Sequence, residues 1–355
     1  PALDAAASAA NDLGVPVVVL LHIEDRYAHA TARRQMFLLQ GARDAQEELR
    51  RRGFHVHVQV DRKESREPVA AAMAKLASLV VAEEPFVAPW MQSLETLLQA
   101  PFEAPVWVVD CSSVVPSALV PKTSCHRAFT FEQATRQLHA ERLRRPWADV
   151  VPKSMAESSI SVGFASIDLA TADFAALVQD MDVDLSVPPV QHTVGGSSAG
   201  YARWRAWIAS GGLKSYAAKR NDALEPHAVS RMSGYLNVGM VSPMRIAREA
   251  NAASGAGKSK FLHEFLTWRG LAYAHFYHFP MPSTGATLEQ LPSWAQDTLQ
   301  RHASDPRQVV PRARLLAGKS GDRAWDGMQT YLVATGELHN NARMGWGKAI
   351  ARWAA

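Results

Sequence analysis

Cysteine is scarce in this chain, and its scarcity narrows the classes of protein to which the chain can belong. The 355 residues contain two cysteines, Cys111 and Cys125. Two cysteines cannot build a disulfide framework, and their spacing fits no zinc motif. Such a pair is typical of proteins that stay in a reducing compartment. We therefore expect an intracellular protein, in cytoplasm, nucleus or organelle, without a metal site.

Long hydrophobic runs and a strong net charge are also missing. The longest apolar stretch, residues 15–23, contains Pro16 and His22 and is far shorter than the roughly 20 residues of a membrane-spanning helix. The sequence therefore predicts no membrane span. A net charge of +4 permits a polyanionic partner without requiring one. At 47% hydrophobic residues, the chain is long enough for two domains with full cores.

Strands and helices alternate over the first 110 residues. A buried-strand pattern over residues 15–21 precedes a helical pattern over 32–52, and His55–Val60 alternates with period two. A further helix is expected over 68–79 and further strands over 79–82 and 106–110. Strands separated by helices of this length predict an α/β domain with a Rossmann-like parallel sheet.

The rest of the chain changes character twice. Residues 111–190 are irregular and rich in Pro, Ser and Arg, which indicates an interdomain connection with a few short helices. Residues 195–200, Gly-Gly-Ser-Ser-Ala-Gly, are expected to be its most flexible part. Beyond Tyr201 strand patterns disappear and helical segments continue to the end, which predicts an all-α second domain.

Three tryptophans near the carboxyl end have a regular spacing. Trp346 follows Trp325 by 21 residues, and Trp353 follows Trp346 by seven. Positions seven apart return to within about 20° of one helix face and lie about 10 Å apart along its axis. Indoles at such separations can pass an electron between a buried cofactor and the surface. The alternative is a set of ordinary core aromatics.

A serine-rich turn precedes a short helical pattern near the middle of the second domain. Ser230 and Ser233 can offer hydroxyls and backbone N–H groups to a diphosphate at a helix amino terminus. A simple helix cap is the alternative interpretation.

Several stretches together resemble the photolyase/cryptochrome family, and most closely its class II cyclobutane pyrimidine dimer (CPD) photolyases. The strongest matches are residues 212–239, 261–271 and 323–353, and weaker ones are residues 33–43 and 114–116. The resemblance implies an antenna-type α/β domain over residues 1–112 and an interdomain connection over 113–200. It also implies an all-α FAD-binding domain over 201–355 that is clipped at its carboxyl end.

The resemblance also implies roles for individual residues. The residues expected to hold FAD are Tyr216, Ser230, Arg231, Met232, Ser233 and Trp268. The residues expected to contact the DNA lesion are Arg220, Asn340 and Met344. Arg343 is expected beside the isoalloxazine ring, and the electron wire is expected to run from Trp346 through Trp325 to Trp353.

The function implied is light-driven repair of CPDs in DNA by electron transfer from reduced FAD. The partner would be DNA that contains pyrimidine dimers, and an antenna chromophore of the deazaflavin or folate type would be compatible. A second hypothesis is a photolyase-derived protein without repair activity. It would be a cofactor-free structural or interaction subunit with protein partners, or a cryptochrome-like photosensor.

One departure from the family pattern bears on repair. Gly270 follows Trp268 and Arg269 at the position where the resemblance leads us to expect a glutamate. The substitution predicts weakened lesion binding and leaves Arg220 without its expected counter-charge.

Four other patterns have ordinary interpretations. They are the P-loop-like end at Gly257-Lys258-Ser259, the metal-like spacing of His275 and His278, the basic run 142–145, and the Trp204 and Trp207 pair, which is expected in the core.

Overall fold

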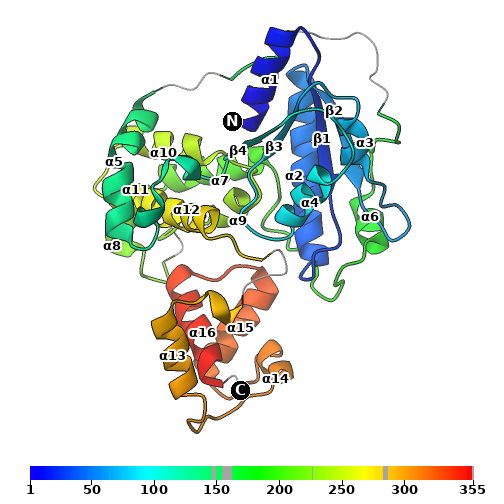
Figure 1. Cartoon of the computed structure of the whole chain (residues 1–355). Helices are drawn as coiled ribbons and strands as arrows, with labels where there is room; N and C mark the ends of the chain where they lie inside the picture. Colours follow the sequence, from blue (N-terminus) through cyan, green and yellow to red (C-terminus); the bar gives the residue numbers. More distant parts are fainter. Residues whose placement is uncertain (146–148, 154–161, 226, 283–286, 354–355) are drawn as a thin grey trace.

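The computed structural model describes residues 1–145, 149–153, 162–225, 227–282 and 287–353 (Figure 1). The amino-terminal part alternates helices and strands in the predicted order. Its elements are α1 (Ala2–Leu13), β1 (Val18–Ile23), α2 (Ala32–Arg51), β2 (His55–Val60), α3 (Val69–Ala74), β3 (Val80–Glu83), α4 (Trp90–Leu98) and β4 (Val106–Val109).

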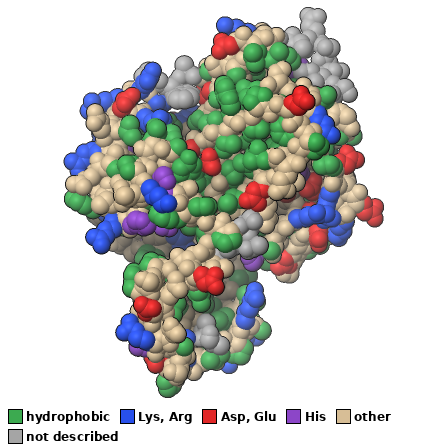
Figure 2. All heavy atoms as spheres, viewed as in Figure 1, with side chains coloured by type: hydrophobic (Ala, Val, Ile, Leu, Met, Phe, Trp, Pro, Cys, Tyr) green, Lys and Arg blue, Asp and Glu red, His purple; other side chains and the backbone are tan. Residues whose placement is uncertain are grey.

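The strands are parallel, as predicted, but the described residues form two ladders in place of one sheet. β1 pairs with β2 from Val18 opposite His55 to Ile23 opposite Val60. β3 pairs with β4, which begins with Val80 opposite Val106. No hydrogen-bonded ladder joins the two pairs within the described residues. Hydrophobic side chains gather on the surface over α1 and the neighbouring strands (Figure 2).

The amino-terminal core forms where α2 crosses the first ladder. The Thr31 side chain accepts a hydrogen bond from the Arg34 backbone N–H and caps the helix. From there the helix buries Leu39 against Val58 of β2. Leu169 and Met181 pack on the same core. This part of the connection, which includes α6 (Phe174–Asp180), therefore belongs to the packed α/β unit.

The expectation of only short helices in the connection was wrong. α5 (Ala128–Arg144) is a 17-residue helix that buries Phe131, Thr135 and His139. Its buried positions recur every four residues, but two of the three are polar, so they left no continuous apolar stripe for a pattern search to find. Two short 3-10 turns, Ser117–Leu119 and Lys122–Ser124, precede it.

The expectation of flexibility at residues 195–200 was also wrong. The Gly195 backbone N–H donates to Gln40 Oε1 at 2.8 Å, and a Cβ added at Gly195 would collide with the Phe37 backbone oxygen. Helix α7 begins at Ser197. The glycines are there because the connection approaches α2 closely.

Beyond Tyr201 the described residues contain helices and no strands, in agreement with the all-α prediction. Trp204 is fully buried and Trp207 is 5% exposed, which confirms that this pair belongs to the core. The helices are α7 (Ser197–Ala209), α8 (Gly212–Lys219), α9 (Ser233–Asn237), α10 (Pro243–Ala252), α11 (Lys258–His263), a π-helix (Glu264–Trp268), α12 (Arg269–His278), a 3-10 turn (Leu288–Gln290), α13 (Ser293–Arg301), α14 (Arg312–Leu316), α15 (Arg323–Thr335) and α16 (Asn340–Trp353).

The last four helices form a lobe below the rest of the chain (Figure 1). α15 packs on α14 and α16. None of the helices described is both long enough and apolar enough to cross a bilayer. The domain boundaries expected at residues 112 and 200 stay a prediction.

Candidate functional site

The three tryptophans meet where α15 crosses α16. The ring of Trp325 lies nearly parallel to that of Trp346, with centroids 5.9 Å apart and an interplanar angle of 5°. Trp353 meets the ring of Trp325 edge-on, with centroids 5.5 Å apart and an interplanar angle of 84°. Trp325 is 2% exposed, and the other two are partly exposed. The indoles therefore touch in the order Trp346, Trp325, Trp353, although their role in electron transfer stays a prediction.

Hydrogen bonds fix two indoles of this tryptophan triad, those of Trp325 and Trp346. Trp325 Nε1 donates to the backbone oxygen of Trp346 at 2.9 Å. Trp346 Nε1 donates to Gln329 Oε1 at 3.0 Å. Each ring is therefore held by an amide carbonyl as well as by packing.

Arg220 has a counter-charge, contrary to the expectation drawn from Gly270. Its Nη2 lies 3.3 Å from Glu264 Oε1, and Lys260 Nζ lies 2.6 Å from the same oxygen. Arg220 and Glu264 are each about 23% exposed. Because the pair is partly shielded from solvent, its electrostatic interaction is stronger than that of a fully exposed pair.

The structure leaves no room for a glutamate side chain at Gly270 without a shift of its neighbours. Gly270 is buried on α12, and a Cβ added there would lie 2.7 Å from Cζ of Phe131. Glu264, four residues before Trp268, takes the electrostatic role that we had assigned to position 270. Arg220 therefore has a counter-charge that does not come from position 270, and the expected weakening of lesion binding stays a prediction.

Trp268 and Arg269 point to different surroundings. Trp268 ends the π-helix and is 52% exposed, so its indole is available to a ligand. Arg269 donates from Nε to the Ser112 backbone oxygen at 2.8 Å and from Nη2 to that of Leu236 at 3.2 Å. Arg269 thus fastens the helical part to the end of the α/β part.

The serine-rich turn carries the one non-glycine residue with positive φ among the described residues. Arg231 has φ 53°, and its Nη1 lies 3.0 Å from Glu337 Oε2. Neither the Ser230 nor the Ser233 hydroxyl bonds to another described side chain or backbone group, so both stay available as donors. The Met232 side chain is buried in the helical core, and its predicted contact with a cofactor stays a prediction.

Tyr216 borders the same region from α8. Its ring meets Phe261 edge-on at 5.4 Å and Trp207 at 6.0 Å. Burial raises the pKa of the Tyr216 phenol, with Glu264 adding to the effect and Arg220 opposing it. Tyr216 is therefore a neutral hydroxyl beside the Arg220 and Glu264 pair.

The start of α16 approaches this region from the carboxyl-terminal lobe. Asn341 Nδ2 donates to the Asn221 backbone oxygen at 3.3 Å, next to Arg220. His339 Nε2 is shielded from solvent, and Nδ1 accepts a hydrogen bond from the Asn341 backbone N–H at 3.2 Å. Burial lowers the pKa of His339, and Arg231 adds to the effect, while the Arg220 backbone and the charge of Asp222 oppose it.

The other predicted residues of α16 lie on its exposed side. Asn340 Oδ1 accepts from Arg343 Nη2 at 2.7 Å, and both residues are exposed. Met344 is 52% exposed. All three are accessible to a ligand, and the structure gives Arg343 no carboxylate partner among the described residues.

The residues of this region fit a cofactor that carries a diphosphate. Ser230 and Ser233 offer hydroxyls, and Arg231, which also contacts Glu337, offers a cation. Sequence reasoning missed His339, Glu337 and Glu264. Glu264 could have been found, because a residue four positions before Trp268 and four after Lys260 shares a helix face with both.

The alternative sites of the sequence have structural explanations. His275 Nδ1 lies 3.1 Å from the Cys125 backbone oxygen and His278 Nε2 lies 2.7 Å from that of Val120. Lys258 Nζ donates to the Asn251 backbone oxygen. No group of three potential metal ligands occurs in the described part of the chain.

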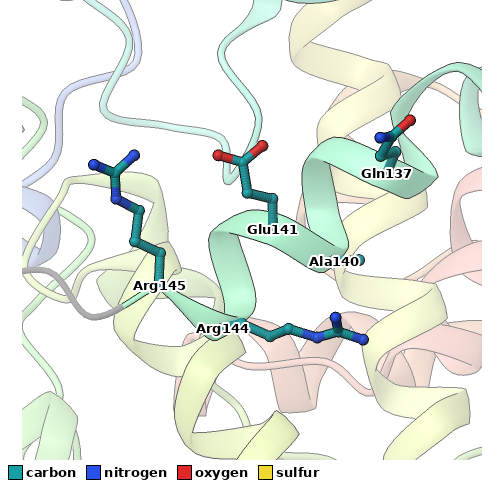
Figure 3. A pocket seen from close by; sticks show the side chains of 5 residues that line it. All are labelled: Gln137, Ala140, Glu141, Arg144 and Arg145. Atoms are coloured by element: carbon teal, nitrogen blue, oxygen red, sulfur yellow. The ribbon is translucent and has the colours of Figure 1, made fainter.

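The basic run of α5 lies beside a hollow of about 480 Å³. In Figure 3, Glu141 and Arg145 point to one side of the helix end, and Arg144 points away from them. The residues that line it are Gln137, Ala140, Glu141, Arg144 and Arg145. All of these residues lie on α5 or at its end, so the hollow is an open surface groove that is separate from the candidate site.

The known proteins that resemble this chain in sequence or fold are photolyases and cryptochromes. No protein-family model matches the chain. A deoxyribodipyrimidine photo-lyase of Methanothermobacter thermautotrophicus is 28% identical over 359 residues, covering 99% of this chain and 74% of the relative.

Solved structures agree with that relative in fold. A class III photolyase of Agrobacterium tumefaciens matches 99% of this chain and 70% of its own, with a TM-score of 0.70 and 17% identity. A cryptochrome of Synechocystis matches 97% of this chain and 71% of its own, with a TM-score of 0.66 and 17% identity. Taken together, these comparisons show that the chain is similar over nearly its whole length to photolyases in sequence and to photolyases and cryptochromes in fold.

Proposed function

We propose that the protein is a flavoprotein that repairs cyclobutane pyrimidine dimers in DNA by light-driven electron transfer from reduced FAD, as class II photolyases do. The observation that carries the proposal is the contact of Trp325 with both Trp346 and Trp353. Three indoles in contact form a path for an electron. A hydrophobic core can be packed without three consecutive tryptophan contacts. Relatives named deoxyribodipyrimidine photo-lyase support the same activity.

The residues proposed to hold FAD are those around the serine-rich turn. Ser230, Ser233 and Arg231 would bind the diphosphate, because hydroxyls and a guanidinium stabilise phosphate oxygens. Tyr216 and Trp268 would border the cofactor. When bound, FAD would supply the light absorption and the electron donated to the dimer. A deazaflavin or folate antenna is compatible with this role.

The lesion is proposed to bind beside Arg220 and Glu264. Arg220 would contact the phosphates or carbonyls of a flipped dimer, and Glu264 would accept hydrogen bonds from the pyrimidine N–H groups. Exposed Trp268 offers a face on which a base can stack. Asn340 and Met344 would contact the lesion from α16.

The tryptophan triad is proposed to recharge the cofactor. Trp346 would give an electron inward, Trp325 would refill Trp346, and partly exposed Trp353 would refill Trp325 from the solvent side. Arg343 would supply a positive charge near the ring system, where it favours added negative charge.

The first experiment is the visible absorption spectrum of the protein after reconstitution with FAD, before and after blue illumination with a reductant. We expect bound flavin that bleaches in the light, and we expect the protein to split a CPD in a short oligonucleotide. Trp325→Phe should slow the bleaching, whereas Trp294→Phe, which alters an indole that is 70% exposed on α13, should not.

A second variant separates repair from photoreduction. Glu264→Gln should lower dimer repair by about tenfold or more, as expected for loss of a charge-assisted hydrogen bond worth about 1.5–3 kcal/mol, while photoreduction persists. A protein that cannot be loaded with FAD, or one in which Trp325→Phe bleaches at the normal rate, would overturn the proposed function.

A further inference from the structure

Gln329 lies on α15, one helical turn after Trp325, and contacts Trp346 of the tryptophan triad. It is 7% exposed, and its amide makes two bonds. Nε2 donates to the Leu316 backbone oxygen at 3.2 Å, while Oε1 accepts from Trp346 Nε1 at 3.0 Å. Since the Leu316 oxygen can only accept, it fixes which way the amide points. The carbonyl oxygen therefore faces the indole.

The indole N–H of Trp325 also donates to an amide carbonyl. Trp325 Nε1 donates to the backbone oxygen of Trp346 at 2.9 Å. An amide carbonyl accepts a hydrogen bond but is too weak a base to remove a proton. A carboxylate or a water cluster in the same place would be a better proton acceptor.

This difference matters once an indole loses an electron. The oxidised indole is a radical cation, and its N–H is much more acidic than that of the neutral ring. If a neighbouring base takes this proton, a neutral radical remains, which is a weaker oxidant and traps the hole. If the proton stays, the radical cation takes an electron from the next indole and returns to its starting form.

We propose that Gln329 is a positioning residue of the electron path, which keeps the Trp346 N–H on a non-basic carbonyl so that the hole moves on. An oxidant, either excited flavin or an added photo-oxidant, removes one electron from Trp346. Trp346 then takes an electron from Trp325, and Trp325 takes one from Trp353. The proton leaves only at Trp353, to water. This step rests on the electron-transfer role proposed above.

The test uses a photo-oxidant in place of flavin, so it does not depend on cofactor binding. A ruthenium polypyridyl complex, with persulfate as sacrificial electron acceptor, is attached to Lys348→Cys on the exposed side of α16. Cys111→Ser and Cys125→Ala remove the native thiols. Transient absorption after a flash distinguishes the tryptophan radical cation from the neutral radical, because the cation absorbs at longer wavelength.

Gln329→Glu introduces a base at the same place. Because burial raises the pKa of a carboxyl group, this variant is measured in alkaline buffer, where the carboxylate is ionised. We expect the neutral radical to form early and the late signal that depends on Trp353 to be lost. Gln300→Glu, the same change at an exposed position of α13, should show the radical-cation and neutral-radical signals in the same order and at the same times as wild type.

Gln329→Met tests the hydrogen bond itself. In protein with ¹⁵N-labelled tryptophan and no flavin, this variant should shift the Nε1–H resonance of Trp346 and speed its exchange with solvent, while the Trp204 resonance stays in place. An early signal in Gln329→Glu that matches wild type, or a Trp346 resonance that Gln329→Met leaves unmoved, would overturn the inference. Failure of the protein to bind FAD would overturn only the proposed function.

Discussion

At Gly270 the absence of a side chain is a packing requirement. An added Cβ would lie 2.7 Å from Cζ of Phe131, and Phe131 is 1% exposed, so the ring has little room to move. We expect Gly270→Ala to lower the free energy of unfolding by about 1–3 kcal/mol through overpacking. This loss outweighs the gain of about 1 kcal/mol that alanine brings to a helix interior. Urea denaturation measures the difference.

Gly327 provides the matched control for this prediction. It lies in α15, and a Cβ added there would meet no atom within 4 Å. Gly327→Ala should therefore raise the free energy of unfolding by up to about 1 kcal/mol. If both variants were stabilised alike, Phe131 would not be packed against Gly270 as the structure has it.

At the scale of single residues, sequence could predict some spatial relations and not others. The relation between Trp346 and Trp353 follows from the helix repeat, which is local. The counter-charge of Arg220 was assigned to the wrong position, because the partner depends on how α8 packs on α11, the helix that leads into the π-helix. A motif read in one dimension placed the carboxylate at residue 270, whereas the structure supplies it from Glu264.

At the scale of elements, α2 caps α7 from a distant part of the chain. The N-cap residue of α7 is Gly196, which has no side chain to cap the helix. Asp44 Oδ2 instead accepts from the Ser198 backbone N–H at 2.8 Å and from Ser197 Oγ at 3.0 Å. We expect Asp44→Ala to lower the free energy of unfolding by about 1–2 kcal/mol at neutral pH.

This contribution should depend on pH in a definite direction. Burial alone would raise the pKa of Asp44, but hydrogen bonds from Ser198 and Ser197 outweigh it and hold the pKa below its ordinary value. A carboxyl with a lower pKa in the folded state stabilises the fold above its unfolded pKa, about 3.9, and stops doing so as pH falls through the folded pKa. The wild type should therefore approach Asp44→Ala in stability below about pH 4.

Urea denaturation at neutral and acidic pH checks both parts of this prediction. Asp12→Ala, at an exposed position of α1, is the control and should change stability little at either pH. A stability difference for Asp44→Ala that persisted unchanged in acid would mean that the charge of Asp44 does not contribute.

Elements differ in how far sequence could define them. The structure has α2 and β2 within a residue of the predicted bounds, because apolar periodicity and a Thr31 cap are local signals. α5 was missed because its buried Thr135 and His139 are polar. The order at residues 195–200 depends on contacts with α2, some 150 residues earlier, and no local pattern carries that information.

At the scale of the whole molecule, one carboxylate joins the carboxyl-terminal lobe to the rest. Glu337 Oε1 lies 2.9 Å from Arg203 Nη1 of α7, and Glu337 Oε2 lies 3.0 Å from Arg231 Nη1 of the serine-rich turn. Arg33 of α2 adds a bond from Nη2 to the Val333 backbone oxygen at 2.7 Å. The lobe that carries the tryptophan triad is thereby held against the proposed FAD site, and the bond to Glu337 also restrains the positive-φ turn at Arg231.

Glu337→Gln should loosen this attachment without unfolding the core. Glu337 is 22% exposed, and its two charge-assisted hydrogen bonds are each worth about 1.5–3 kcal/mol, of which a neutral amide retains a fraction. We expect faster backbone hydrogen exchange in α15 and α16 and unchanged protection in β1 and β2. Glu289→Gln, at an exposed position outside this contact, should change neither. Because the lobe and the turn share this one side chain, uniform loss of protection throughout the chain would instead mean that the lobe and the core unfold as a single unit.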